Sequence, residues 1–115
     1  MSDQPNGAIL SADDVEALLT GDDRITIEVY VPEWRKAVRL RQLTAAEGIS
    51  IAEAPKHDGI LTVVALSVVD ANGNRLFKDI DRLRGRSAAA LARIQTAALK
   101  LNGFDTNAVS AAKNA

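Results

Sequence analysis

The chain of 115 residues contains no cysteine, one histidine, and only one Trp, one Tyr and two Phe. Without cysteine it can form neither a disulfide framework nor a thiolate nucleophile or a cysteine-based metal site. With so few aromatic rings, the hydrophobic core has to be built from Ala, Leu, Ile and Val. No apolar run approaches the roughly 20 residues that cross a bilayer. The formal net charge of −1 argues against a dedicated nucleic-acid binder, because such proteins bind mainly by neutralising phosphates.

Patterns typical of catalysis or ligand binding are also scarce. His57 has neither a cysteine nor a second histidine to work with, so a solvated loop residue is the simplest interpretation. The segment 70–81 partly follows a calcium-loop pattern, but Arg75 stands where that loop needs glycine. No phosphate-binding loop is present. We therefore expect no enzyme, no cofactor and no metal, and a protein that acts by binding other proteins.

The N-terminal third predicts a short helix followed by a β-hairpin. Ser11 with two following aspartates is typical of a helix start, and Gly21 is a natural stop. Apolar and polar residues alternate over 25–31 and again over 38–41, which predicts two half-buried strands. The polar residues between the strands predict that they form a hairpin over 24–31 and 37–42.

The alternation also predicts a register for this hairpin. The register that matches apolar with apolar and acid with base has four pairs: Val31 with Val38, Val29 with Leu40, Glu28 with Arg41, and Tyr30 with Arg39. A slip by one residue would lose both kinds of match.

The middle of the chain is less decisive. Thr44 and Glu47 have the spacing of a capping box, which predicts a helix that Gly48 weakens and Pro55 ends. Residues 60–69 are apolar on nearly every side, so periodicity alone leaves both helix and strand open. The polar, Asn-Gly-containing stretch that follows, 70–74, predicts a tight turn.

The last third predicts a long helix. After a short turn at 79–83, Ser87 caps an Ala-rich segment that runs through Leu101. Its apolar residues fall on one stripe at helical spacing, namely Leu91, Ile94, Ala98 and Leu101. Asn102 and Gly103 end the helix, and Phe104 stands where a Schellman-type apolar contact would form.

Together, these elements predict an α+β fold. A small N-terminal β-hairpin packs on a mainly helical domain with a long C-terminal helix. We expect a flexible lead over 1–10, a single domain over 11–104 and a flexible tail over 105–115.

Three residues of the hairpin are candidate partner-binding residues: Trp34, Arg39 and Arg41. Tryptophan is enriched among binding hot spots, and this one either folds back on the hairpin or is offered to a partner. The later basic cluster at 82–86 is balanced by nearby aspartates, so a solvated face is the default there and a partner contact is the alternative.

Three blocks of residues together resemble a known family. In chain order they are Val31-Pro32-Glu33-Trp34 with Val38-Arg39-Leu40-Arg41 and Leu43-Thr44; Ser67-Val68-Val69-Asp70 with Gly73, Leu76-Phe77 and Asp81; and Ser87-Ala88-Ala89-Ala90-Leu91 with Ile94, Ala97-Ala98 and Leu101-Asn102-Gly103. Their order and spacing are similar to those of the tail assembly chaperones of long-tailed bacteriophages and prophages. The resemblance spans roughly residues 8–104.

The resemblance implies a non-enzymatic protein of the bacterial host cytoplasm that is absent from the mature virion. Its partners would be the tape measure protein, which it holds soluble, and the tail tube protein, which it helps recruit. Self-association is left open. Because members of the family are mostly helical, the resemblance favours a helix at 60–69.

Two other functions compete with this one. A structural virion connector or tail-completion protein would also be a non-enzymatic protein binder. A small nucleic-acid-binding regulator would use a basic hairpin surface with Trp34, formed by Arg35, Lys36, Arg39 and Arg41.

Overall fold

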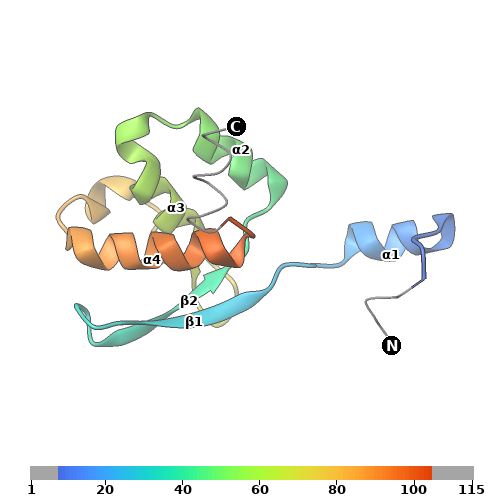
Figure 1. The fold of residues 1–115 in the computed structure, drawn as a ribbon, viewed down its shortest axis with the longest axis horizontal. Coiled ribbons are helices and arrows are strands. Elements are labelled where there is room, and N and C mark those ends of the chain that lie inside the picture. Colours follow the sequence, from blue (N-terminus) through green and yellow to red (C-terminus); the bar gives the residue numbers. More distant parts are fainter. Residues whose placement is uncertain (1–7, 105–115) are drawn as a thin grey trace.

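The computed structural model describes residues 8–104 of the chain (Figure 1). The predicted tail, 105–115, and most of the predicted lead, 1–10, lie outside this range, so the division into lead, domain and tail stays a prediction. The elements follow one another in this order: η1 (Ala12–Asp14), α1 (Val15–Thr20), β1 (Thr26–Val31), β2 (Lys36–Arg41), α2 (Ala45–Glu53), η2 (Lys56–Asp58), α3 (Gly59–Ser67), β3 (Val68–Val69), η3 (Ile80–Leu83) and α4 (Ala88–Leu101). The predicted α+β fold is confirmed, with a hairpin near the N-terminus and the longest helix at the C-terminal end.

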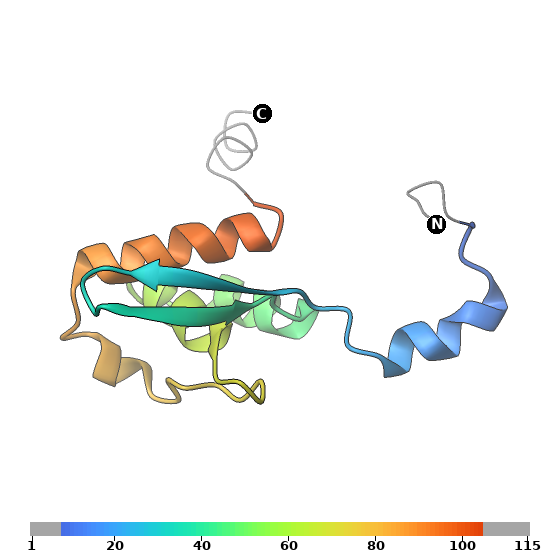
Figure 2. The same cartoon turned by 90° about the horizontal axis from the view of Figure 1, so that it is seen from below.

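One layer of helices covers one face of a three-stranded antiparallel sheet, whose order is β1-β2-β3. In Figure 2 the strands lie in front of α3 and α4, and both helices contact them. The core between the layers is aliphatic, as the composition predicts. Its buried members include Val31, Val38 and Leu40 from the hairpin, Leu61, Val63 and Val64 from α3, and Leu91, Ile94 and Ala98 from α4. On the other face of the sheet, Thr26, Glu28 and Tyr30 of β1 are exposed, whereas Val69 of β3 is buried.

The hairpin is confirmed, but its predicted register is wrong by two residues. Val29 pairs with Val38, and Glu28 pairs with Arg39. Apolar residues still face one another, because a shift of two keeps every side chain on its own face. The cause is a tight loop of four residues, 32–35, in which Arg35 adopts a left-handed backbone with φ of 53°. Such a position is usually occupied by glycine or asparagine. The arginine at position 35 therefore did not indicate a left-handed backbone.

Residues 60–69 combine both structures that the sequence left open. The helix favoured by the resemblance is present, since α3 runs to Ser67. The chain then turns extended, and Val68 and Val69 pair with β2 as a two-residue strand. The predicted turn at 70–74 follows, closed by the Asp70 carboxylate, which accepts hydrogen bonds from two backbone N–H groups within the turn.

The predicted ends of the two other helices of the body are confirmed. In α2, the Thr44 hydroxyl accepts from the Glu47 N–H, and the Glu47 carboxylate accepts from the Thr44 N–H. In α4, the Ser87 hydroxyl caps the first turn. At its far end, the N–H of Phe104 donates to the Leu99 carbonyl at 2.7 Å, which is the hydrogen bond of a Schellman motif.

Candidate functional site

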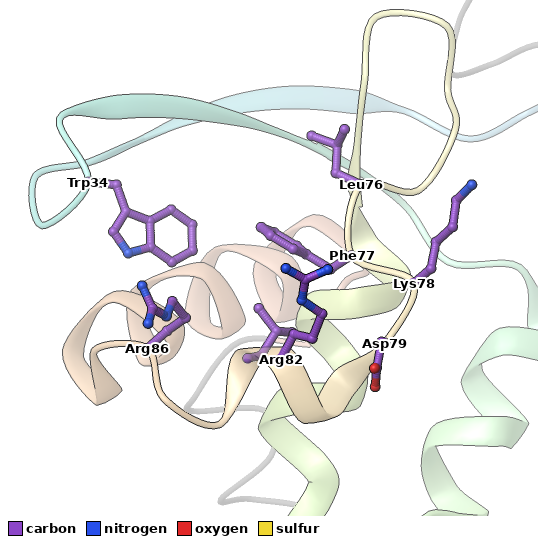
Figure 3. Close-up of a pocket in the computed structure, with 8 residues that line it drawn as sticks. Trp34, Leu76, Phe77, Lys78, Asp79, Arg82 and Arg86 are labelled. Carbon is purple, nitrogen blue, oxygen red and sulfur yellow. The ribbon is translucent and has the colours of Figure 1, made fainter.

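An open groove of about 930 Å³ lies where the hairpin loop meets the segment that precedes α4. We call it the Trp34 groove, and its lining comprises Trp34, Leu76, Phe77, Lys78, Asp79, Arg82, Leu83 and Arg86 (Figure 3). The Trp34 indole and the Phe77 ring meet edge to face, with centroids 6.2 Å apart. Both rings pack against the core, whereas Leu76 beside them is 56% exposed. The groove therefore offers an apolar surface on a rigid base.

The rim of the Trp34 groove is basic. Lys78, Arg82 and Arg86 are all exposed, and Asp79 is the one acidic residue of the lining. Within residues 8–104, neither Arg82 nor Arg86 forms an ion pair. Asp79 is used locally, because its carboxylate accepts a hydrogen bond from the Asp81 N–H at the start of η3. The groove is thus suited to an apolar segment that carries negative charge.

Arg84 lies between these two arginines in sequence, but it forms ion pairs within the fold and does not line the groove. Its guanidinium donates to the Asp81 carboxylate at 2.8 Å and lies 2.9 Å from the Asp58 carboxylate. These carboxylates, Asp81 first, raise the pKa of Arg84 above its ordinary value. The basic cluster of the sequence therefore divides: Arg84 is bound to acidic residues, while its two neighbours remain on the groove.

The loop that carries Trp34 is tied to α4. The Glu33 carboxylate accepts two hydrogen bonds from the Arg93 guanidinium, at 3.1 and 3.4 Å. This contact holds the pKa of Glu33 below its ordinary value. This ion pair links the loop that carries the indole to α4.

Arg39 lies on the face of the sheet opposite the buried Leu40. Its side chain is 39% exposed, and its guanidinium lies 3.5 Å from the carboxylate of Glu28, which is its cross-strand partner. An exposed pair of this kind contributes little to stability. Arg39 therefore remains within reach of a partner.

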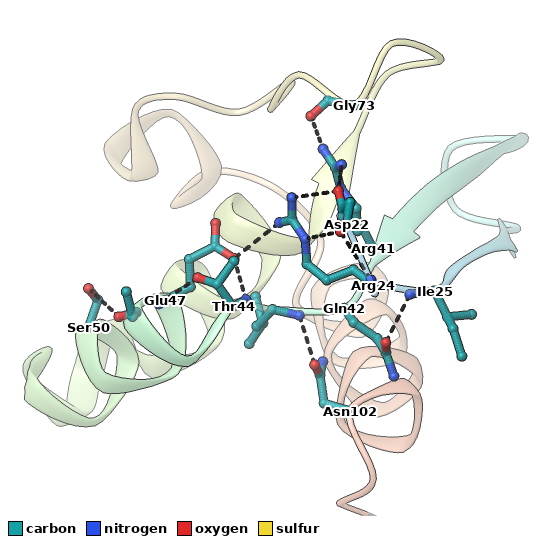
Figure 4. A network of polar contacts seen from close by, with 12 residues as sticks. Asp22, Arg24, Ile25, Arg41, Gln42, Thr44, Glu47, Ser50, Gly73 and Asn102 are labelled. Carbon is teal, nitrogen blue, oxygen red and sulfur yellow. Dashed lines mark hydrogen bonds and ion pairs between the residues drawn. The ribbon is translucent and has the colours of Figure 1, made fainter. Parts of the chain in front are cut away.

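Arg41 belongs to a network of polar contacts between side chains of this protein (Figure 4). Its guanidinium lies 3.2 Å from the Asp22 carboxylate and also donates to the carbonyl of Gly73. Arg24 holds the same carboxylate through two side-chain hydrogen bonds, at 3.0 and 3.1 Å, and lies 3.7 Å from Glu47. These contacts, those of Arg24 above all, lower the pKa of Asp22 to about 2.

The three candidate residues from the sequence thus lie in two places. Trp34 lines the groove at the hairpin loop, while Arg39 and Arg41 flank the turn at 70–73. Their role in partner binding stays a prediction. The sequence did not single out Phe77 as the partner of Trp34, although an apolar pair after a polar turn was a usable signal.

The N-terminal segment, residues 8–20, projects from the body as an arm (Figures 1 and 2). No residue of η1 or α1 is buried. Five aliphatic side chains of this arm are exposed by 39–92%, namely Ile9, Leu10, Val15, Leu18 and Leu19. The predicted helix is present, and Ser11 donates through its N–H and hydroxyl to the Asp14 carboxylate. The root of the arm is the Asp22 network described above.

A second, smaller groove of about 390 Å³ lies among α2, α3 and the end of α4. Leu43, Ile51, Val63, Leu99 and Phe104 form most of its apolar lining. It carries no charged side chain, in contrast to the Trp34 groove.

His57 is the one histidine of the chain. His57 is 77% exposed, and its imidazole lies 3.6 Å from the Asp58 carboxylate. Over residues 8–104, no three potential metal-ligating side chains of His, Cys, Asp or Glu come together. In the same range, no helix is both long and apolar enough to cross a membrane.

Comparison with known proteins finds a similar fold among solved structures. No protein-family model matches the chain, and no curated protein sequence matches it. Among solved structures, the tail assembly chaperone of bacteriophage HK97 aligns with a TM-score of 0.59. The fold resembles that of a phage tail assembly chaperone. The alignment covers 79% of this chain and 95% of the chaperone at 20% sequence identity, so the likeness concerns the fold.

Proposed function

We propose that the chain is a phage tail assembly chaperone that binds the tape measure protein and helps recruit tail tube subunits. The observation that carries this proposal is the fold, which matches 95% of the HK97 tail assembly chaperone. The chain would act by binding alone, without catalysis. Its place of action would be the cytoplasm of the bacterial host, before the finished particle forms.

The exposed apolar surfaces support a role in binding apolar helices. The Trp34 groove and the smaller groove among the helices both expose apolar side chains, and the arm adds an aliphatic face. Exposed apolar patches that are rimmed by polar residues commonly mark protein-interaction sites. A long, apolar helical client needs such surfaces to stay in solution.

Co-expression with the tape measure protein of the same phage or prophage tests the proposal. We expect the tape measure protein to move from the insoluble to the soluble fraction and to co-purify with this chain. Trp34→Ala and Arg39→Glu should each weaken capture. Lys56→Glu should leave capture unchanged, because Lys56 is exposed and lies outside both the Trp34 groove and the surface around Arg39. A tape measure protein that stays insoluble, or that is soluble without binding, would contradict the proposal.

Mass spectrometry of purified particles separates this role from that of a virion component. A chaperone should be missing from the finished particle. Stoichiometric amounts of the chain in particles would instead identify a connector or tail-completion protein.

A further inference from the structure

The Trp34 groove concentrates positive charge in a chain whose formal net charge is −1. Its lining includes Lys78, Arg82 and Arg86 but only one acidic residue, Asp79. The Asp79 carboxylate already accepts a hydrogen bond at the start of η3. Glu33 of the adjacent hairpin loop is already paired with an arginine of α4, at 3.1 Å. The groove therefore attracts a partner that carries negative charge.

The apolar part of the groove suits aliphatic side chains. Trp34 and Phe77 pack edge to face on each other and against the core. Leu76, which lies beside them in the lining, is aliphatic and 56% exposed. Nucleic acids are bound instead by stacking their bases on open aromatic faces along a basic groove. An apolar protein segment that carries carboxylates therefore fits this groove better than a nucleic acid does.

The groove recognises its partner through side chains. The main-chain N–H groups of Leu76, Arg82 and Arg86 already donate to carbonyls of this chain, at 3.0–3.2 Å. An extended peptide would therefore lack these donors for its own main chain. A helix bonds its main chain internally and presents only side chains to a groove. The occupant that fits best is an amphipathic helix with an aliphatic face and acidic residues beside that face.

We propose that the Trp34 groove binds an acidic amphipathic helix of the tape measure protein. This inference rests on the proposed function and adds to it the binding site and the chemistry of the bound segment. Aliphatic side chains of that helix cover Trp34, Phe77 and Leu76. Its Asp and Glu residues pair with Arg82 and Arg86 at the rim. The basic rim thereby selects which helix of the client binds, because like charges are repelled.

Trp34 is the one tryptophan of the chain, so its fluorescence reports on the groove directly. Synthetic peptides of about 20 residues, long enough for several helical turns, tile the tape measure protein and are titrated into the full chain at low salt. We expect the peptides that combine aliphatic and acidic residues to shift the Trp34 emission to shorter wavelength. Added salt should weaken their binding. Tightest binding by lysine- and arginine-rich peptides would overturn the proposal.

Charge reversal in the groove tests the role of the basic rim. Arg82→Glu/Arg86→Glu should weaken binding of the acidic peptides about tenfold or more, and it should reduce capture of the full-length tape measure protein. The matched control Lys56→Glu/Lys100→Glu changes the net charge by the same amount outside the groove and should bind normally. A peptide whose acidic residues are replaced with lysine should prefer the groove variant to the wild type. Far-UV circular dichroism verifies that each variant is folded.

The outcomes separate failure of this inference from failure of the proposed function. If the groove variant captures the tape measure protein as well as the wild type does, the groove is not the binding site, and the proposed function stands. If the wild-type chain captures no tape measure protein, both are wrong. Two competitors test other occupants: a peptide of residues 8–20 of this chain and a single-stranded oligonucleotide. If either binds the groove more tightly than every tape measure peptide, the proposal is overturned.

Discussion

Trp34 meets Phe77 edge to face, with the planes of the two rings inclined by 63°. An aromatic pair of this geometry contributes about 0.5–1.5 kcal/mol beyond the area it buries. Trp34→Ala should therefore lower the free energy of unfolding by ~1–3 kcal/mol while leaving the chain folded. Chemical denaturation followed by circular dichroism measures the change. Trp34→Phe, which keeps a ring against Phe77, should lose less.

This packing bears on the use of Trp34→Ala as a binding variant. The same substitution is proposed above to weaken capture of the tape measure protein. Because the indole also packs against the core, capture has to be compared at a temperature where both proteins are fully folded. If Trp34→Ala shows no loss of stability, the ring is not held by Phe77, and the groove loses its rigid base.

Gly73 is a position where only glycine suits the structure. Its φ is +86°, and a Cβ placed there would lie 2.5 Å from the Arg41 guanidinium. Gly73→Ala should lower the free energy of unfolding by about 1–3 kcal/mol, through backbone strain and displacement of that side chain. Gly85→Ala is the matched control, since nothing lies within 4 Å of a Cβ at that position. Equal thermal midpoints for the two variants would contradict the strain expected from the left-handed backbone of Gly73.

Local chemistry made much of the fold predictable from the sequence. The capping residues Ser87 and Thr44 and the closing residue Gly103 act within one turn of their own helix, so their neighbours in sequence are sufficient to identify them. The alternation in the hairpin likewise predicted which residues face the core. The register was not predictable, because it depends on the left-handed backbone of Arg35, a residue that rarely adopts it.

The candidate site was harder to predict because it joins distant segments. Trp34 lies in the loop between β1 and β2, whereas Phe77 follows β3, and no local pattern pairs them. The basic cluster posed a different difficulty. Only the positions of Asp58 and Asp81 show that Arg84 is engaged within the fold while Arg82 and Arg86 remain on the groove.

Gly48 weakens α2 and lies in the lining of the smaller groove. It lies inside the helix, and nothing is within 4 Å of a Cβ at that position. Gly48→Ala should raise the free energy of unfolding by about 0.5–1 kcal/mol, because alanine restricts the unfolded chain more and favours the helix. Thermal unfolding monitored at a helix-sensitive wavelength measures the gain. A loss of stability would mean that this face of α2 lies close against something in solution, and a change in sedimentation would show whether that is another copy.

The Asp22 network should make stability depend on pH in the acid range. In the folded chain the pKa of Asp22 is lowered from 3.8 to about 2, chiefly by the side chain of Arg24. The folded state therefore releases this proton more readily than the unfolded state does. The stabilising contribution is present above about pH 3.8 and is lost as the pH falls toward 2.

Asp22→Asn removes this contribution at every pH. The variant should be less stable than the wild type at neutral pH, and the gap between their thermal midpoints should close between pH 4 and pH 2. Asp23→Asn is the matched control, because within residues 8–104 the Asp23 carboxylate forms no ion pair. Asp22 is half-exposed, so added salt should also narrow the gap. A gap that stays constant with pH would mean that Asp22 acts through the shape of the turn rather than through its charge, and the arm would then be directed by the backbone alone.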